Sequence, residues 1–192
     1  MDSPETVNQE VMLVHGLGGW KSRLAIRSLV FLLNLRPRKP KIHVFSPKWQ
    51  SNESAQDKLE RLESYWIEKN KPTRLVGISA GANPVRYLAV RNSSEVSTVN
   101  LIAGYIGDGT DISDKHRKEA PAFADASELT HTQIQKTPED SSKTTLHLPI
   151  FDDVIAEHNL IIQGVQQLQI PKEGHSQAIA WSLLHDLPKI AS

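Results

Sequence analysis

The sequence predicts an α/β protein in which about six mostly parallel strands form a buried sheet with helices on both faces. Short apolar runs rich in β-branched residues alternate with longer stretches whose apolar residues have helical spacing. Such alternation is typical of right-handed βαβ units, whose strands are covered on both faces. The length of 192 residues also suits one domain with a sizeable core, because domains of about 100–150 residues are the commonest.

Two strand–helix pairs are predicted in the first third of the chain. The strand-like VMLVHG precedes the helical LAIRSLVFLLNL, and KIHVFSP precedes SAQDKLERLESYWIEKN. The second helix has the clearest signal, since Ser54 can cap its start. Its residues Leu59, Leu62 and Trp66 form an apolar stripe among charged side chains, and this stripe is expected to face the core.

The middle of the chain departs from this regular pattern. RLVGIS and AGANPVRYLAVRN form a third pair and STVNLIAG a fourth strand, but residues 107–144 are rich in Asp, Ser, Thr and Lys, with few large apolar side chains. We therefore predict a polar insertion outside the sheet over 107–144, in which the charged stretch 111–118 is a solvated surface. Insertions at the strand ends of such sheets are where binding sites are shaped.

The parallel pattern resumes in the last quarter of the chain. A strand TTLHLPIF, a helix VIAEHNLIIQ closed by Gly164, a strand VQQLQIP and a final helix SQAIAWSLLHDLPKI are predicted. No internal repeat is visible, and no linker is long enough to separate two domains. Residues 1–192 are therefore expected to form a single domain.

Charge and composition narrow the classes of function. Basic and acidic residues both number 22, the pI is about 7.1 and aromatic residues make up 6%, so no global field draws the protein to nucleic acid or to an anionic membrane surface. The absence of cysteine excludes disulfides, thiolate zinc sites and a cysteine nucleophile. The start MDSPETVNQE lacks the layout of a secretory signal, and no apolar run approaches the roughly 18–20 residues that span a bilayer. These features predict a cytoplasmic protein that acts on a small molecule.

No cofactor or metal is expected from the sequence. The glycine-rich turn after the first strand lacks both the GKS/T and the G-x-G-x-x-G patterns of phosphate-binding loops. Six histidines outside the candidate site show no paired ligand spacing such as H-E-x-x-H; they are His43, His116, His131, His147, His158 and His185.

The stretch Gly77-Ile78-Ser79-Ala80-Gly81 matches the G-x-S-x-G pattern. A strand-like run precedes it and a helical pattern follows, which is the strand–turn–helix setting of a nucleophile elbow. In that setting the serine takes strained backbone angles, while Gly77 and Gly81 let neighbouring chain pass closely. We therefore predict that Ser79 is a nucleophile, and the alternative is a small residue at a tight turn.

A serine nucleophile needs a histidine to accept its proton and an acid to orient that histidine. His175 lies between the strand-like VQQLQIP and the final helix, and Asp152 and Asp153 directly follow the strand-like LHLPIF. All three are expected at the carboxyl edge of the sheet, where sites of such folds form. Both aspartates remain candidates for the acid, and either could instead cap a following helix.

An oxyanion hole would complete this chemistry with backbone N–H groups aimed at the developing negative charge. The glycines of VHGLGG permit a turn after the first strand, and the N–H groups of Leu17 and Ala80 are the predicted donors. His15 is expected to be structural, with its ring hydrogen-bonded to local backbone. Trp20 and Trp49 could wall an acyl pocket or pack in the core.

Together these stretches resemble the α/β-hydrolase superfamily: HGLGG after the first strand, GISAG at the elbow, FDDVIA at the acid turn and GH before the last helix. The similarity covers roughly residues 11–190. Because nothing strand-like precedes VMLVHG, the chain resembles minimal members without two leading antiparallel strands. Small bacterial lipases are such members, and small intracellular serine hydrolases of the retinoblastoma-binding-protein type are a closer match.

The resemblance favours Asp152 as the acid and leaves Asp153 in reserve, because many members have a D-x-V-V-P-like turn that DDVIA matches from Asp152. The chain has Ile78 before the serine, where the family often has His, and Ala156 where Pro is common. The resemblance implies a carboxylesterase-like serine hydrolase that cleaves small ester or thioester substrates, with short acyl chains expected. The alternative is a catalytically weak or inactive protein of the same fold that binds a protein or ligand, with 107–144 docking the partner.

Overall fold

The computed structural model describes residues 10–36 and 40–191, and its centre is one six-stranded sheet in the order β2-β1-β3-β4-β5-β6. Each pair of neighbouring strands is parallel. The α/β class and the six strands predicted from the sequence are therefore confirmed. The strands are β1 (Val11–Val14), β2 (Ile42–Phe45), β3 (Arg74–Ile78), β4 (Thr98–Ile102), β5 (Thr144–Phe151) and β6 (Gln166–Glu173).

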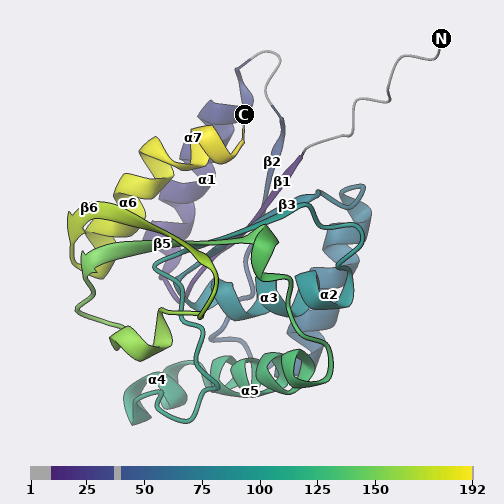
Figure 1. The fold of residues 1–192 in the computed structure, drawn as a ribbon, viewed down its shortest axis with the longest axis vertical. Helices are drawn as coiled ribbons and strands as arrows, with labels where there is room; N and C mark the ends of the chain where they lie inside the picture. Colours follow the sequence, from purple (N-terminus) through teal and green to yellow (C-terminus); the bar gives the residue numbers. More distant parts are fainter. Residues whose placement is uncertain (1–9, 37–39, 192) are drawn as a thin grey trace.

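Helices cover both faces of the sheet (Figure 1). One face is covered by α1 (Trp20–Asn34), α6 (His175–His185) and α7 (Leu187–Ile190), whose buried apolar side chains form one core cluster with the sheet. The other face is covered by α2 (Ala55–Glu68) and α3 (Ala82–Arg91), with a second cluster. Because all six strands run in the same direction, the turns that lead from strands into helices lie together at one edge of the sheet, where ligand sites of such folds lie.

The helix α2 illustrates how local sequence sets an element. Ser54 caps the helix by accepting a hydrogen bond from the backbone N–H of Asp57 at 3.1 Å. Leu59, Leu62 and Trp66 are each 1% exposed and form the predicted stripe toward the core. Burying side chains of this size stabilises the fold by about 1.5–3 kcal/mol each.

The segment 107–144, predicted from the sequence as a polar insertion outside the sheet, is helical over much of its length. It contains α4 (Asp114–Glu119) and α5 (Pro121–Lys136), which together make the crossover between the parallel neighbours β4 and β5. The helix α5 packs against α3. Its signal in the sequence is weak because its buried residues are mostly small or polar: Ala122, Phe123, Ala124, Ala126, Ser127 and Thr130.

An ion pair between a buried arginine and a partly buried glutamate ties the end of this crossover to α3. The guanidinium of Arg86 donates two hydrogen bonds to the Glu139 carboxylate, at 3.0 and 2.9 Å. It also donates to the side-chain oxygen of Asn83 and to the backbone oxygen of Ile106, both at 2.9 Å. These bonds satisfy charged groups whose burial would otherwise be costly, so a segment of polar composition is held firmly against the fold.

The helix predicted over 154–163 is wrong, because the structure has only the single 3₁₀ turn η3 (Glu157–Asn159) there. Asp152 Oδ1 accepts hydrogen bonds from the backbone N–H groups of Val154 and Ile155, each at 2.8 Å. The backbone oxygen of Asn159 accepts the N–H of Ile106 at 2.9 Å. The Asp152 side chain thus fixes a local turn after β5, and the Asn159 oxygen, which an α-helix would pair internally, is used by a tertiary contact that overrides local propensity.

None of the described helices is both long and apolar enough to cross a membrane.

Candidate active site

Ser79 stands on a tight turn between β3 and α3, within the 3₁₀ turn η1 (Ser79–Gly81). Its backbone φ is 52°, a left-handed conformation that a residue with a side chain adopts only at a cost of about 1–3 kcal/mol. A Cβ atom on Gly77 would lie 2.7 Å from the Cα of Ala82, and one on Gly81 would collide with the carbonyl of Val14. The local geometry is therefore the strained, closely packed turn that the sequence predicts.

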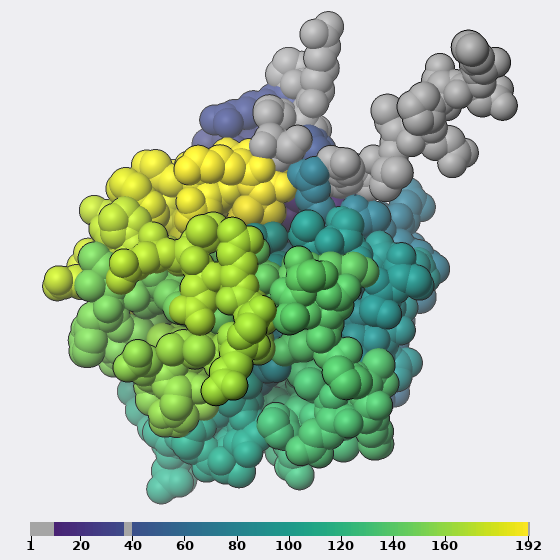
Figure 2. Space-filling view, in the orientation of Figure 1, coloured from purple at the N-terminus to yellow at the C-terminus, as the bar shows by residue number. Residues whose placement is uncertain are grey.

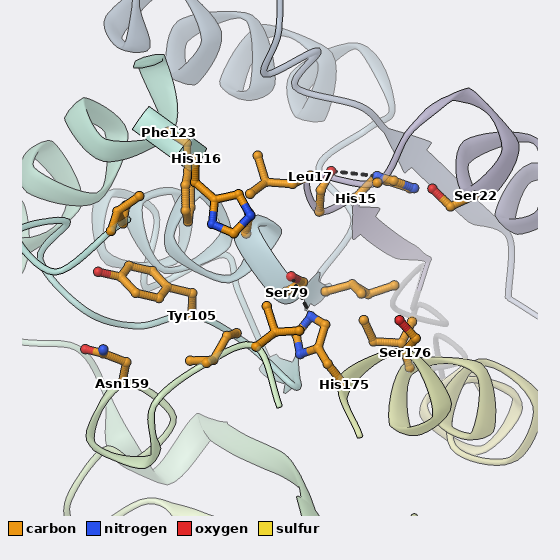
Figure 3. Close-up of a pocket in the computed structure, with 18 of the residues that line it drawn as sticks. His15, Leu17, Ser22, Ser79, Tyr105, His116, Phe123, Asn159, His175 and Ser176 are labelled. Atoms are coloured by element: carbon orange, nitrogen blue, oxygen red, sulfur yellow. Dashed lines mark hydrogen bonds between the residues drawn. The ribbon is translucent and has the colours of Figure 1, made fainter. Parts of the chain in front are cut away.

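Three predicted residues, far apart in the sequence, form one hydrogen-bond chain at the carboxyl edge of the sheet. His175 Nε2 lies 2.9 Å from Ser79 Oγ (Figure 3), and His175 Nδ1 lies 2.7 Å from Asp152 Oδ2. The carboxylate can only accept, so Nδ1 carries the proton and Nε2 is left to accept the hydrogen bond of the Ser79 hydroxyl. This is the arrangement in which histidine acts as a base toward a serine.

The two adjacent aspartates hold different parts of His175. Asp152 accepts from the imidazole ring, whereas Asp153 Oδ1 accepts the backbone N–H of His175 at 2.8 Å. Burial alone would raise the pKa of Asp152, but the hydrogen bonds from His175, Ile155 and Val154 outweigh that effect and hold the pKa below its usual value. Asp152 is thus set up as an ionised partner of the ring, and Asp153 as an anchor for the start of α6.

The predicted oxyanion donors lie beside the serine. Leu17 and Ala80 both line the cavity that contains Ser79. Ala80 lies in the first turn of η1, where a backbone N–H has no acceptor within the helix. His15, in the same turn as Leu17, is 3% exposed and hydrogen-bonds through Nδ1 to the backbone oxygen of Gly16 at 2.8 Å. Burial lowers the pKa of His15, which fits the structural role expected for it.

The cavity around Ser79 has a volume of about 580 Å³. Figure 3 shows Ser79 and His175 near its middle, with Ser22 on one side and Tyr105 on the other. The Ser22 side is walled by α1 and α6 through Ala25, Ile26, Ile179, Ala180 and Leu183. Ligand cavities commonly have volumes of about 300–1,000 Å³, so this one can hold a small organic substrate with its reacting bond at Ser79.

Neither tryptophan considered for the pocket wall lines this cavity. Trp20 is 65% exposed on α1. Trp49 is 2% exposed and packs edge-on against Phe123, with ring centroids 5.4 Å apart. Phe123, from α5, supplies the aromatic wall instead.

Several polar residues of the cavity were not predicted from the sequence. Asp111 accepts hydrogen bonds from the Tyr105 hydroxyl, at 2.6 Å, and from the side-chain amide of Asn159. Burial would raise the pKa of Asp111, but these hydrogen bonds hold it below its usual value. His116 of α4 lines the same cavity, so the stretch 111–118 is more than a solvated surface. No sequence pattern links these residues: Tyr105 and Asp111 lie between β4 and α4, His116 lies in α4 and Asn159 in η3, and only the fold brings these segments together.

No three His, Asp or Glu side chains within residues 10–36 and 40–191 are placed to hold a metal ion.

Comparison with known proteins finds similarity to solved structures but not to family models or curated sequences. No protein-family model matches the sequence, and no curated protein sequence matches it. One similar solved structure comes from work on LipS and LipT, two metagenome-derived lipolytic enzymes; it has a TM-score of 0.63 and 12% identity, over 94% of this chain and 92% of that one.

Two further solved structures agree with this likeness. A pyrethroid hydrolase, PytH, has a TM-score of 0.60 and 10% identity, over 95% of this chain and 97% of that one. The Paleococcus ferrophilus monoacylglycerol lipase has a TM-score of 0.58 and 14% identity, over 95% and 94%. Since the likeness spans nearly the whole chain and includes the parallel sheet with its flanking helices, the protein has the α/β-hydrolase fold.

Proposed function

We propose that this protein is a serine hydrolase that cleaves small carboxylic esters or thioesters through a covalent acyl-enzyme. The observation that carries the proposal is the chain of hydrogen bonds from Ser79 Oγ to His175 Nε2 at 2.9 Å and from His175 Nδ1 to Asp152 Oδ2 at 2.7 Å, in a cavity of about 580 Å³. A hydroxyl, an imidazole and a carboxylate in this order supply a nucleophile, a base and an orienting charge.

In the proposed acylation step, Ser79 Oγ attacks the carbonyl carbon of the substrate while His175 Nε2 takes the hydroxyl proton. The Asp152 carboxylate stabilises the imidazolium that forms, and its lowered pKa keeps it ionised at neutral pH. The N–H groups of Leu17 and Ala80 hold the negative oxygen of the tetrahedral intermediate. As the bond to the leaving group breaks, His175 returns the proton to the departing alcohol or thiol.

In the proposed deacylation step, water replaces the leaving group. His175 Nε2 accepts a proton from the water as its oxygen attacks the acyl carbon, and the same oxyanion donors stabilise the second tetrahedral intermediate. Collapse of this intermediate releases the carboxylic acid and returns the proton to Ser79 Oγ. The enzyme is regenerated without a cofactor in either step.

The substrate class is proposed from the walls of the cavity. The side next to α1 and α6 is apolar, whereas the other side carries the polar groups of Tyr105, Asp111 and Asn159 beside further apolar residues. A substrate with a short apolar acyl chain and a polar remainder fits both sides. The solved hydrolases of the same fold include lipolytic enzymes and a pyrethroid hydrolase, which supports ester cleavage as the reaction class.

A fluorophosphonate probe and a panel of esters of graded acyl length test the proposal. Wild type should be labelled and should turn over short esters. Ser79→Ala should not be labelled, and its turnover rate should be about 10⁶-fold lower. The matched control is Ser176→Ala, because Ser176 lines the same cavity without taking part in the hydrogen-bond chain. This control should keep labelling and turnover.

The same experiment tests the alternative that the protein is a binding module with the same fold and without hydrolase activity. Folded wild type that neither reacts with the probe nor shows Ser79-dependent turnover across the panel would contradict the proposal and favour binding. Equal labelling of wild type and Ser79→Ala would show that another residue is the nucleophile.

A further inference from the structure

The helix α1 exposes a stripe of large apolar side chains on the side opposite its buried face. Trp20, Leu24, Phe31 and Leu35 are 65%, 57%, 63% and 63% exposed. Their spacing of four, seven and four residues places them on one side of the helix. The opposite side packs on the sheet through Ile26, Val30 and Leu33.

This stripe is unusual for the surface of a water-soluble fold. Single exposed apolar residues are common and need no explanation, but contiguous apolar patches mark interaction sites. Leu32, which is 60% exposed, widens the patch along the second half of the helix. The packing of α1 on the sheet is already complete through its buried face, so the stripe contributes nothing to the core.

The charged residues of α1 all have one sign. Residues 11–52 contain eight lysines and arginines but no aspartate or glutamate, although the whole chain has no net charge. Within α1, Lys21, Arg23 and Arg27 lie between or beside the apolar positions. The charges that α1 itself carries are therefore all positive, although basic and acidic residues balance over the whole chain.

The same helix also borders the cavity. Ser22, Ala25 and Ile26 of α1 line the space that holds Ser79, and Figure 3 shows Ser22 on that side of the serine. In Figure 1, α1 lies with α6 and α7 on one face of the sheet, away from α4 and α5. A surface that meets the stripe would therefore lie next to one side of the cavity.

We propose that α1 docks in the plane of an anionic lipid surface, with Trp20, Leu24, Phe31 and Leu35 inserted at the boundary of headgroups and acyl chains. A helix with an apolar stripe, basic flanks and no acidic residue has the chemistry of interfacial helices, whose cations bind lipid phosphates. The basic flanks distinguish this occupant from a second copy of the chain, because two such helices would repel each other. The inference does not rest on the hydrolase activity proposed above.

Co-sedimentation with vesicles tests this docking, using the full chain and the Ser79→Ala variant so that binding is measured apart from any turnover. The vesicles are phosphatidylcholine alone or phosphatidylcholine mixed with phosphatidylglycerol. Both proteins should bind the anionic vesicles more tightly, and added salt should weaken that binding. Phe31→Asp should weaken binding about tenfold or more, and Arg27→Glu about fivefold or more.

Matched controls come from the other face of the sheet. Ile67 on α2 is 54% exposed and Lys136 ends α5, so Ile67→Asp and Lys136→Glu repeat the chemical changes away from α1. Both should bind vesicles like wild type, and circular dichroism should show that all four variants are folded. Absence of vesicle binding, equal losses in the controls, or a dimer that Phe31→Asp dissociates without vesicle binding would each overturn the proposal.

Discussion

Asp152 and Asp153 are adjacent in the sequence but have two different physical roles. The ring of His175 contacts the first carboxylate and the backbone N–H of His175 contacts the second, because successive side chains leave a strand end in different directions. A charged carboxylate beside the ring stabilises a positive imidazolium, whereas one beside the backbone holds only the position of the helix start. The two residues are therefore expected to differ in catalysis more than in stability.

Exchanging each aspartate for asparagine tests this division. Asp152→Asn removes the charge and allows the wrong histidine tautomer, so kcat should fall by about 10⁴-fold, by analogy with the serine-protease triad. Asp153→Asn keeps an oxygen that can accept the His175 N–H, and kcat should stay within about tenfold of wild type. Ester hydrolysis by the two purified variants measures both values. A larger loss in Asp153→Asn would assign the acid to Asp153 instead.

At the scale of elements, the connections after β4 and β5 depend on side-chain hydrogen bonds more than on apolar periodicity. The Arg86–Glu139 pair anchors the crossover 107–144, and the side chains of Asp152 and Asn159 hold the loop after β5 through their bonds to the Ile155 N–H and to Asp111. Arg86 and the Glu139 side chain are 6% and 14% exposed. Breaking such a pair is costly because the remaining charge is left buried.

Removing the Glu139 charge should therefore destabilise the protein strongly. Glu139→Gln is expected to lower the free energy of unfolding by about 3 kcal/mol, close to the cost of unpairing a buried ion. The control is Glu95→Gln, which breaks the exposed Lys71–Glu95 pair of 2.7 Å and should cost less than about 1 kcal/mol. Urea denaturation of the three proteins measures the differences, and equal losses would contradict the anchoring role of Arg86.

At the scale of the whole molecule, two buried histidines couple stability to pH. His15 and His147 are each 3% exposed, and burial lowers the pKa of both below the ordinary value of 6.5. The unfolded chain takes up protons on these rings as the pH falls below 6.5, while the folded protein resists doing so. Stability due to the neutral rings is therefore present above pH 6.5 and is lost as the pH falls toward their folded pKa values.

Urea denaturation at a series of pH values should show this loss. The free energy of unfolding should begin to fall below pH 6.5, by at most about 1.4 kcal/mol per pH unit for each histidine. His147→Gln keeps a hydrogen-bonding side chain near Asn100 but cannot titrate, so its slope should be smaller than that of wild type. A free energy of unfolding that stays constant between neutral pH and the carboxylate range would contradict this coupling.

The sequence by itself determined the sheet and much of the candidate site. Strand and helix periodicity depend on local spacing, and in a parallel sheet the carboxyl ends of all strands lie on one edge, so Ser79, His175 and the aspartate pair 152–153 are expected to lie together from the sequence alone. The glycines of the elbow and of the VHGLGG turn likewise permit tight turns, and this effect depends only on the local backbone.

Only the tertiary structure decided the features that depend on partners distant in sequence. The helix expected over 154–163 gives way to a loop in which the backbone oxygen of Asn159 bonds to Ile106 of another segment, and α5 forms although its buried residues are mostly small or polar. Tyr105, Asp111 and Asn159 meet through the folded loops. The stripe on α1 is visible as such only once the buried face of that helix is known, because periodicity alone does not say which apolar residues the core covers.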